Sequence, residues 1–286
     1  MSAARPVAFT AEDGVRLVGD SRGPEDGPLV LLLHGGGQTR HAWTRTATRL
    51  AGEGYHVVTY DARGHGDSDW SPDGDYALPR HGMDLLAVLR TLGEPAGLVG
   101  ASMGGTSALI AASDEPARAW GLILVDIVPG FAARGVQRVR AFMTANPEGF
   151  ASLDEAAAAV SAYNPNRQSR NPAGLMRNLR EGPDGRLRWH WDPKVIGNTP
   201  TAKTSDMLAA RLHSLPERLP ILLVAGANSD VVDDRAMDTF RAQAPHAEVI
   251  SVARAGHMVA GDRNYAFGDA ISSFLARARA RAAVAG

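Results

Sequence analysis

The stretch Leu98–Ser113 reads LVGASMGGTSALIAAS, a short apolar run that leads into a serine with glycines two residues before and two residues after it. An alanine-rich pattern typical of a helix follows at once. A strand that turns directly into a helix brings the two backbones close together, so the positions that flank the turn need small residues. Gly100 and Gly104 meet that requirement around Ser102. The stretch therefore predicts a sharp strand–helix turn with Ser102 at its tip.

A turn of this kind suits a nucleophilic serine. A serine hydroxyl is a weak nucleophile at neutral pH, and it needs a base to accept its proton and donors to stabilise an oxyanion. The turn exposes the hydroxyl above the sheet and leaves the N–H group of Met103 at the positive end of a helix. The alternative is a glycine-rich turn with a bystander serine, because the G-x-S-x-G pattern by itself is weak. A catalytic Ser102 requires a second oxyanion donor, an acid and a base elsewhere in the chain.

The second oxyanion donor is expected from the loop after an earlier buried strand. The run Pro28–His34, PLVLLLH, is almost entirely apolar and is followed by three glycines, whose N–H groups carry no covering side chain. We predict an oxyanion hole made of Gly36 N–H and Met103 N–H, with Gly37 N–H as the next choice. A plain glycine turn is the alternative. His34 is expected to be structural rather than catalytic.

The acid and the base are expected at the ends of later strands. Asp230 follows the buried run ILLVAG, and Asp126 ends the run LILVD. Our hypothesis takes Asp230 as the acid, because serine, acid and histidine then follow one another on successive strand ends. Asp126 is the competing acid, and a helix-capping role for either aspartate is a third interpretation. His257, in ARAGHMVAGD after the last predicted strand, is the predicted base, so the predicted triad is Ser102, Asp230 and His257.

Strands and helices alternate along most of the chain, which predicts an α/β fold with a largely parallel sheet covered by helices on both faces. The alternation stops after Gly130 and resumes near Leu215, and the block between them has a helical or irregular pattern with no clear strand. The expected organisation is a first core part over residues 1–129, a helical cap over 130–215 and a second core part over 216–286.

Composition excludes several classes of protein. The formal net charge of −1 over 286 residues gives no basic surface for nucleic acid. The absence of cysteine excludes a disulfide scaffold, a cysteine metal site and a thiol nucleophile. No uninterrupted apolar run reaches the roughly 18 residues that a membrane span needs. We expect a cytoplasmic protein, a monomer or homodimer, whose partner is a small-molecule substrate and neither nucleic acid nor membrane.

These motifs together resemble the α/β-hydrolase fold family, in its capped branch of epoxide-hydrolase-like and haloperoxidase-like proteins. The resemblance is carried by HGGG (34–37), DARGHGDSD (61–69), GASMGG (100–105), LVDIVP (124–129), GANSDVV (226–232) and AGHM (255–258). It implies a mostly parallel sheet of about eight strands with a helical cap over the site. Epoxide hydrolases and haloalkane dehalogenases carry aspartate where Ser102 stands, and epoxide hydrolases typically use two cap tyrosines, whereas this insertion has only Tyr163. The resemblance therefore disfavours both of these chemistries.

The expected function is hydrolysis of a carboxylic ester or lactone of a small, mostly apolar molecule through an acyl-enzyme on Ser102. This mechanism needs no metal and no organic cofactor. Cleavage of a carbon–carbon bond in a diketone acid is an alternative on the same triad, although related enzymes of that kind usually carry asparagine where Ala101 stands. Perhydrolysis is another alternative, and a non-catalytic ligand receptor is a third.

The expected cap is rich in aromatic and basic residues. We expect its aromatic residues to form mainly the small core that a helical insertion needs, rather than a pocket lining. His190, between two tryptophans, is expected to pack within the insertion. Six arginines occur between Arg167 and Arg188 against two acids. We expect them to be solvated or paired with acids, and a site for a carboxylate-bearing substrate is the alternative.

Overall fold

The computed structural model describes residues 3–164, 172–198, 200–253, 255–257 and 265–285. An eight-stranded sheet lies at the centre, with the strand order β1-β2-β4-β3-β5-β6-β9-β10. All pairs from β4 to β10 are parallel, and only β1–β2 and β2–β4 are antiparallel. The eight strands are β1 (Arg5–Thr10), β2 (Arg16–Arg22), β3 (Leu29–Leu33), β4 (His56–Tyr60), β5 (Ala96–Ala101), β6 (Ala119–Val125), β9 (Ile221–Gly226) and β10 (Glu248–Val252). This is the mostly parallel eight-stranded sheet that the motifs imply.

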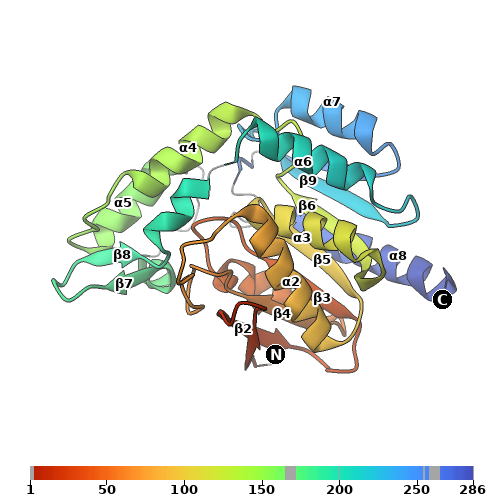
Figure 1. Cartoon of the computed structure of the whole chain (residues 1–286), viewed down its shortest axis with the longest axis horizontal. Helices are drawn as coiled ribbons and strands as arrows, with labels where there is room; N and C mark the ends of the chain where they lie inside the picture. The colour runs from red at the N-terminus through yellow and green to blue at the C-terminus, as the bar shows by residue number, and fades with distance from the viewer. Residues whose placement is uncertain (1–2, 165–171, 199, 254, 258–264, 286) are drawn as a thin grey trace.

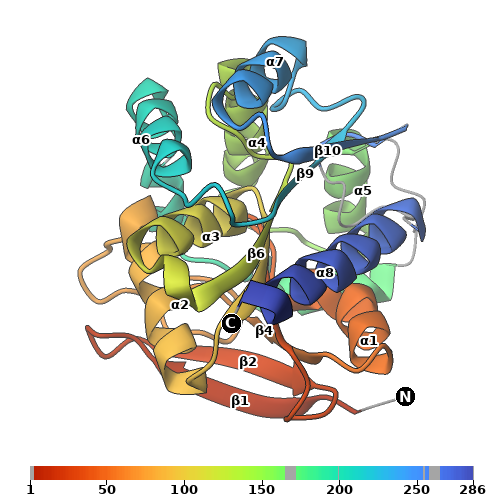
Figure 2. The same ribbon diagram turned by 90° about the vertical axis from the view of Figure 1, so that its right-hand side faces the viewer.

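The central strands are apolar because helices cover both of their faces. Every residue of β3 is buried, and its side chains alternate between two hydrophobic cores. Val30 and Leu32 pack with α1 (Thr44–Gly52) and α8 (Tyr265–Ala285). Leu31 and its neighbours on the other face pack with α2 (Leu78–Leu92), α3 (Met103–Asp114), α6 (Ala202–His213) and α7 (Asp234–Gln243). Figure 2 shows the sheet between these two helical layers.

The segment between β6 and β9 contains most of the structure outside this sandwich. Its elements are α4 (Ala133–Thr144), α5 (Leu153–Tyr163), η3 (Pro172–Asn178), β7 (Leu179–Glu181), β8 (Leu187–Trp189), η4 (Pro193–Asn198) and α6 (Ala202–His213). Figure 1 shows α4, α5 and the β7–β8 hairpin together at one end of the molecule. The expectation of no strand in this block is wrong, because strands of three residues are too short to produce a readable alternation. Nowhere in the described residues is a helix both long enough and apolar enough to cross a bilayer.

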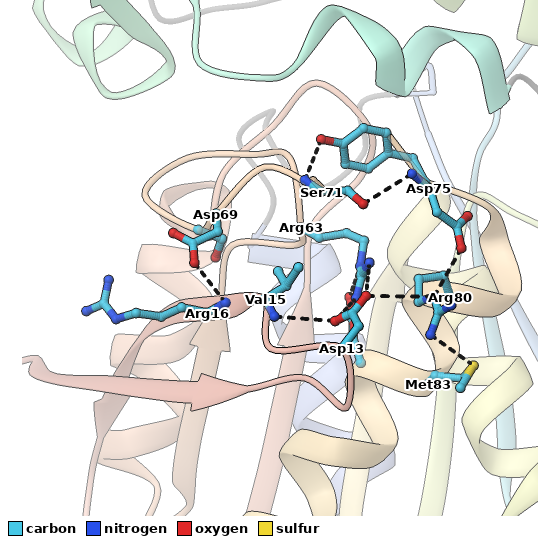
Figure 3. A network of polar contacts seen from close by, with 12 residues as sticks. Asp13, Val15, Arg16, Arg63, Asp69, Ser71, Asp75, Arg80 and Met83 are labelled. Atoms are coloured by element: carbon cyan, nitrogen blue, oxygen red, sulfur yellow. Dashed lines mark hydrogen bonds and ion pairs between the residues drawn. The ribbon is translucent and has the colours of Figure 1, made fainter. Parts of the chain in front are cut away.

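The loop after β4, which carries the DARGHGDSD motif, is held by a fully buried arginine (Figure 3). The Arg63 guanidinium donates to both carboxylate oxygens of Asp84 at 2.6 Å and to Asp13 at 2.8 and 3.1 Å. The hydrogen bond from Arg63 lowers the pKa of Asp13, while burial raises the pKa of Asp84. A bidentate pair of this kind fixes the loop in one geometry. Arg63 therefore has a structural role at this edge of the sheet.

Candidate active site

Ser102 stands at the junction of β5 and α3, in the sharp turn that the sequence predicts. Its backbone has φ 47° and ψ −113°, a conformation that non-glycine residues rarely adopt. A Cβ atom on Gly100 would lie 2.3 Å from the carbonyl oxygen of Gly104, and one on Gly104 would lie 2.4 Å from that of Leu33. Neither position has room for a side chain. The glycines therefore allow strand and helix backbones to come close enough to hold Ser102 at the tip.

This close approach predicts a large stability cost for Gly104→Ala. A methyl group there must displace the backbone of β3, so we expect the free energy of unfolding to fall by about 1–3 kcal/mol. The matched control is Gly52→Ala at the end of α1, where a Cβ atom meets nothing within 4 Å. That variant is expected to gain up to about 1 kcal/mol from reduced backbone entropy in the unfolded chain. Urea unfolding of both variants measures the difference, and equal stabilities would contradict the packing described here.

The carboxylate beside His257 is that of Asp126. His257 Nδ1 lies 2.7 Å from Asp126 Oδ2, and the Asp126 side chain is buried. Asp126 Oδ1 accepts the Gly226 N–H at 3.0 Å, and Oδ2 also accepts the Ser229 hydroxyl at 2.6 Å. The Asp126 backbone has φ 52°, in the left-handed region that non-glycine residues seldom enter. Three donors and a strained backbone therefore hold this carboxylate in one orientation against the imidazole.

Asp230, the predicted acid, has a different partner. Its Oδ2 accepts a hydrogen bond from Arg138 of α4 at 3.0 Å, and Arg138 also donates to the Tyr163 carbonyl at 2.7 Å. The structure thus corrects the predicted pairing of Asp230 with His257. Because β6 and β9 are parallel neighbours, both aspartates follow strands that end at the same edge of the sheet. Asp126 comes directly after β6, whereas Asp230 lies four residues beyond β9 in a loop that meets α4.

Ser102 and His257 line one cavity of about 760 Å³. Gly36 and Met103 line the same cavity, so the structure brings together every predicted site residue except Asp230. Within the described residues no hydrogen bond joins the Ser102 hydroxyl to His257. In ligand-free active sites such a bond is often long and tightens when substrate binds. The arrangement therefore places a serine hydroxyl and an oriented imidazole at one cavity.

The geometry of the glycine loop favours Gly36 over Gly37 as an oxyanion donor. Gly37 N–H donates to His65 Nε2 at 3.2 Å. A Cβ atom on Gly36 would meet nothing within 4 Å, because Gly36 faces the cavity. Met103 is the first residue of α3, and the first N–H groups of a helix have no intrahelical acceptor. Among the described residues, neither Gly36 N–H nor Met103 N–H has a hydrogen-bond acceptor.

His34 and His65 are structural residues of the glycine loop. His34 Nδ1 lies 2.8 Å from the Gly35 carbonyl, and His34 Nε2 accepts the Ala62 N–H at 2.9 Å. His65 Nδ1 lies 3.0 Å from the carbonyl of Arg63. Burial lowers the pKa of both imidazoles, that of His65 well below its ordinary value. Both rings are therefore neutral with the proton on Nδ1, and they join the glycine loop to the loop after β4, as expected for His34.

The segment between β6 and β9 contributes an aromatic wall to the cavity. Phe142 of α4 stacks on Tyr163 of α5 with ring centroids 4.3 Å apart, and Trp189 lies 5.6 Å from Phe142. These three rings and Met143 line the cavity, whereas Phe150 and Trp191 are buried. The expectation that cap aromatics form mainly core is therefore only partly right. Burial, together with the negative charge of Asp230, raises the pKa of Tyr163 to about 12, so its hydroxyl keeps its proton at neutral pH.

The fold agrees with comparison to known proteins. A family model described as the alpha/beta hydrolase fold matches residues 28–263. The chain belongs to the α/β-hydrolase fold family. An α/β hydrolase from Novosphingobium aromaticivorans has a solved structure with a TM-score of 0.84 and 27% identity, covering 97% of this chain and 99% of that one.

Two relatives of this α/β hydrolase are named for their activities. It is 30% identical to esterase Rv0045c of Mycobacterium tuberculosis over 246 residues, which are 82% of this chain and 78% of the relative. It is also 30% identical to the sn-1-specific diacylglycerol lipase ABHD11 of Mus musculus over 266 residues, which are 87% of this chain and 81% of the relative. The relatives are thus hydrolases of this fold, and the protein is an α/β-hydrolase enzyme.

Proposed function

We propose that this protein is a serine hydrolase that cleaves a carboxylic ester or lactone of a small, mostly apolar molecule through an acyl-enzyme on Ser102. The observation that carries the proposal is the His257–Asp126 pair in the cavity that Ser102 lines. The esterase and lipase names of the relatives support the same class of reaction. The apolar and aromatic residues of the cap wall favour a substrate that is mostly apolar.

The reaction follows from the positions of these groups. His257 Nδ1 donates to Asp126, which leaves Nε2 free to accept the Ser102 proton while Oγ attacks the carbonyl carbon. The oxyanion that forms accepts hydrogen bonds from Gly36 N–H and Met103 N–H. His257 then protonates the leaving alcohol, and the acyl group remains as an ester of Ser102. Water, deprotonated by His257, attacks this ester, releases the carboxylic acid and restores the serine.

Asp126 acts in this mechanism by holding His257 in one tautomer and stabilising the imidazolium that forms. Gly226 N–H, at the end of β9, and the Ser229 hydroxyl, in the loop that follows, orient Asp126. Asp230 acts outside the chemistry, since its ion pair with Arg138 joins that loop to α4. The proposed catalytic residues are therefore Ser102, Asp126 and His257.

Covalent labelling tests this assignment. We expect a fluorophosphonate probe to add once per chain, with the adduct on the peptide that contains Ser102, and to abolish turnover of p-nitrophenyl butyrate in the same proportion. Folded protein that is neither labelled nor active would indicate the ligand receptor instead. Faster turnover of a vinylogous diketone acid than of any ester would indicate carbon–carbon hydrolysis, and peracid formation from peroxide and acetate in preference to ester hydrolysis would indicate perhydrolysis.

A further inference from the structure

Among the described residues that line the cavity, the side chains with a permanent charge are all arginines. Its described lining residues include no aspartate or glutamate, and the arginines among them are Arg45, Arg49, Arg140 and Arg177. The whole chain has a net charge of −1, so composition does not account for this bias. Arg49 is neutralised by Glu53 at 2.9 Å and Asp269 at 2.6 Å. Arg140 and Arg177 form no ion pair or side-chain hydrogen bond with any described residue.

Arg177 differs from the other arginines of its segment. Arg180 and Arg186 donate to backbone carbonyl groups, and Arg188 forms an ion pair with Asp184. Arg188, paired with Asp184, and Arg180, which lies 4.0 Å from Asp67, match the expectation of pairing with acids. Residues 167 and 170 lie outside the described chain. Arg177 instead lines the cavity on η3. Among the described arginines of this segment, Arg177 is therefore the one that could bind the carboxylate of a substrate.

Arg140 lies on the cavity face of α4. Val136, Val139 and Met143 line the cavity too, and their spacing from Arg140 places all four on one side of the helix. Arg138, which does not line the cavity, forms the ion pair with Asp230. Arg140 is exposed, so its guanidinium is accessible to an anion held in that cavity and can bind it with charge-assisted hydrogen bonds.

Arg177 stands near the core wall of the same cavity. Burial lowers the pKa of His41, and the positive charges of Arg40 and Arg177 lower it further. His41 also lines the cavity, in η1 (Arg40–Trp43) of the core. The Arg177 guanidinium is thus close enough to the core to bind a ligand that lies between the cap segment and the core.

We propose that Arg140 and Arg177 form a carboxylate-binding subsite in the cavity of Ser102, and that the substrate is an ester carrying a carboxylate at one end. A planar guanidinium matches a carboxylate with two parallel hydrogen bonds and stays charged at any physiological pH. The apolar and aromatic residues among the cavity lining, such as Val139, Phe142 and Trp189, suit an aliphatic or aromatic spacer between the two groups. This inference rests on the proposed ester hydrolysis and names the class of substrate for it.

Paired substrates test the subsite. One pair carries the charge on the acyl side, namely mono-p-nitrophenyl adipate and its neutral methyl ester. The other carries it on the alcohol side, namely 4-acetoxybenzoate and methyl 4-acetoxybenzoate. The readout is the ratio of kcat/KM for the anionic member to kcat/KM for the neutral member. We expect wild type to prefer the anionic member of at least one pair, and the double variant Arg140→Gln, Arg177→Gln to lower that ratio about tenfold or more.

Two control variants separate charge recognition from general damage. Arg188→Gln removes an arginine of the same segment that is paired outside the cavity, and it should keep the wild-type ratio. The variant Arg140→Lys, Arg177→Lys keeps both charges and should recover part of the preference. The subsite would be overturned if the enzyme hydrolyses both members of each pair and the double variant has the same kcat/KM ratio as wild type. That result would leave ester hydrolysis in place.

A binding measurement keeps the two proposals separate if no ester is turned over. Monomethyl adipate is titrated calorimetrically into Ser102→Ala protein with and without the two arginine-to-glutamine changes. We expect the changes to raise its Kd about tenfold, and dimethyl adipate to show no such dependence. If monomethyl adipate binds in a way that depends on the two arginines but no ester is hydrolysed, the subsite is retained and the proposed ester hydrolysis is rejected. Absent or arginine-independent binding of monomethyl adipate would reject the subsite whatever the enzyme hydrolyses.

Discussion

Ser102→Ala is expected to lower kcat for p-nitrophenyl butyrate by at least about 10³-fold, because the variant has no group that can form the acyl-enzyme. Alanine at this position must adopt the same positive φ as serine, so the strain of the turn is unchanged and folding should be retained. Steady-state kinetics measure the loss, and the thermal transition of the variant reports on the fold.

Ser107→Ala is the matched control for this substitution. Ser107 lies on α3, the helix that follows Ser102, and its hydroxyl donates to the Met103 carbonyl at 2.9 Å without lining the main cavity. We expect its kcat to stay within a few-fold of wild type, since the lost hydrogen bond is local to α3. Ordinary turnover in Ser102→Ala would remove Ser102 from the mechanism, and an equal loss in both variants would point to damage of the turn instead.

Asp126→Asn is expected to lower kcat roughly 10³–10⁴-fold, because an amide cannot hold His257 with Nδ1 protonated and cannot stabilise the imidazolium. Its size matches that of the carboxylate, so the buried site at the end of β6 should still pack. We would measure kcat on the fraction that elutes as folded protein and shows a cooperative thermal transition.

Asp230→Asn separates the two aspartates. The side chains of Asp230 and Arg138 are 25% and 53% exposed, and a partly exposed ion pair contributes at most about 1 kcal/mol. We therefore expect Asp230→Asn to change kcat less than about tenfold and to act mainly on the attachment of α4. A larger loss in Asp230→Asn than in Asp126→Asn would restore Asp230 as the acid and reject the assignment made from the structure.

The features that could be predicted from the sequence are those encoded locally. The apolar run in β3, the glycines around Ser102 and the turn residues after each strand specify their own conformations, because burial and backbone sterics act over a few residues. The mostly parallel sheet followed from the alternation of such segments. The β7–β8 hairpin escaped prediction because its three-residue strands carry almost no periodicity.

The identity of the acid needed the tertiary structure. Asp126 and Asp230 both follow buried strands, and the order of residues along the chain favoured Asp230 over Asp126. The positive φ of Asp126, adopted immediately after β6, accompanies the approach of its carboxylate to His257 across the adjacent strand. A signal was present in the sequence, since Asp126 follows its strand without an intervening loop. The sequence did not show that this position decides the acid, because the path of the loop after β9, which carries Asp230, was not known.

By itself, then, the sequence determined a parallel α/β sheet and a serine on a strained turn, since both depend on contacts between near neighbours in the chain. Only the tertiary structure decided which carboxylate meets His257, which glycine N–H has no acceptor among the described residues and which arginines line the cavity. Those choices depend on how loops from distant strands pack against one another, and residue spacing alone carries little information about that packing.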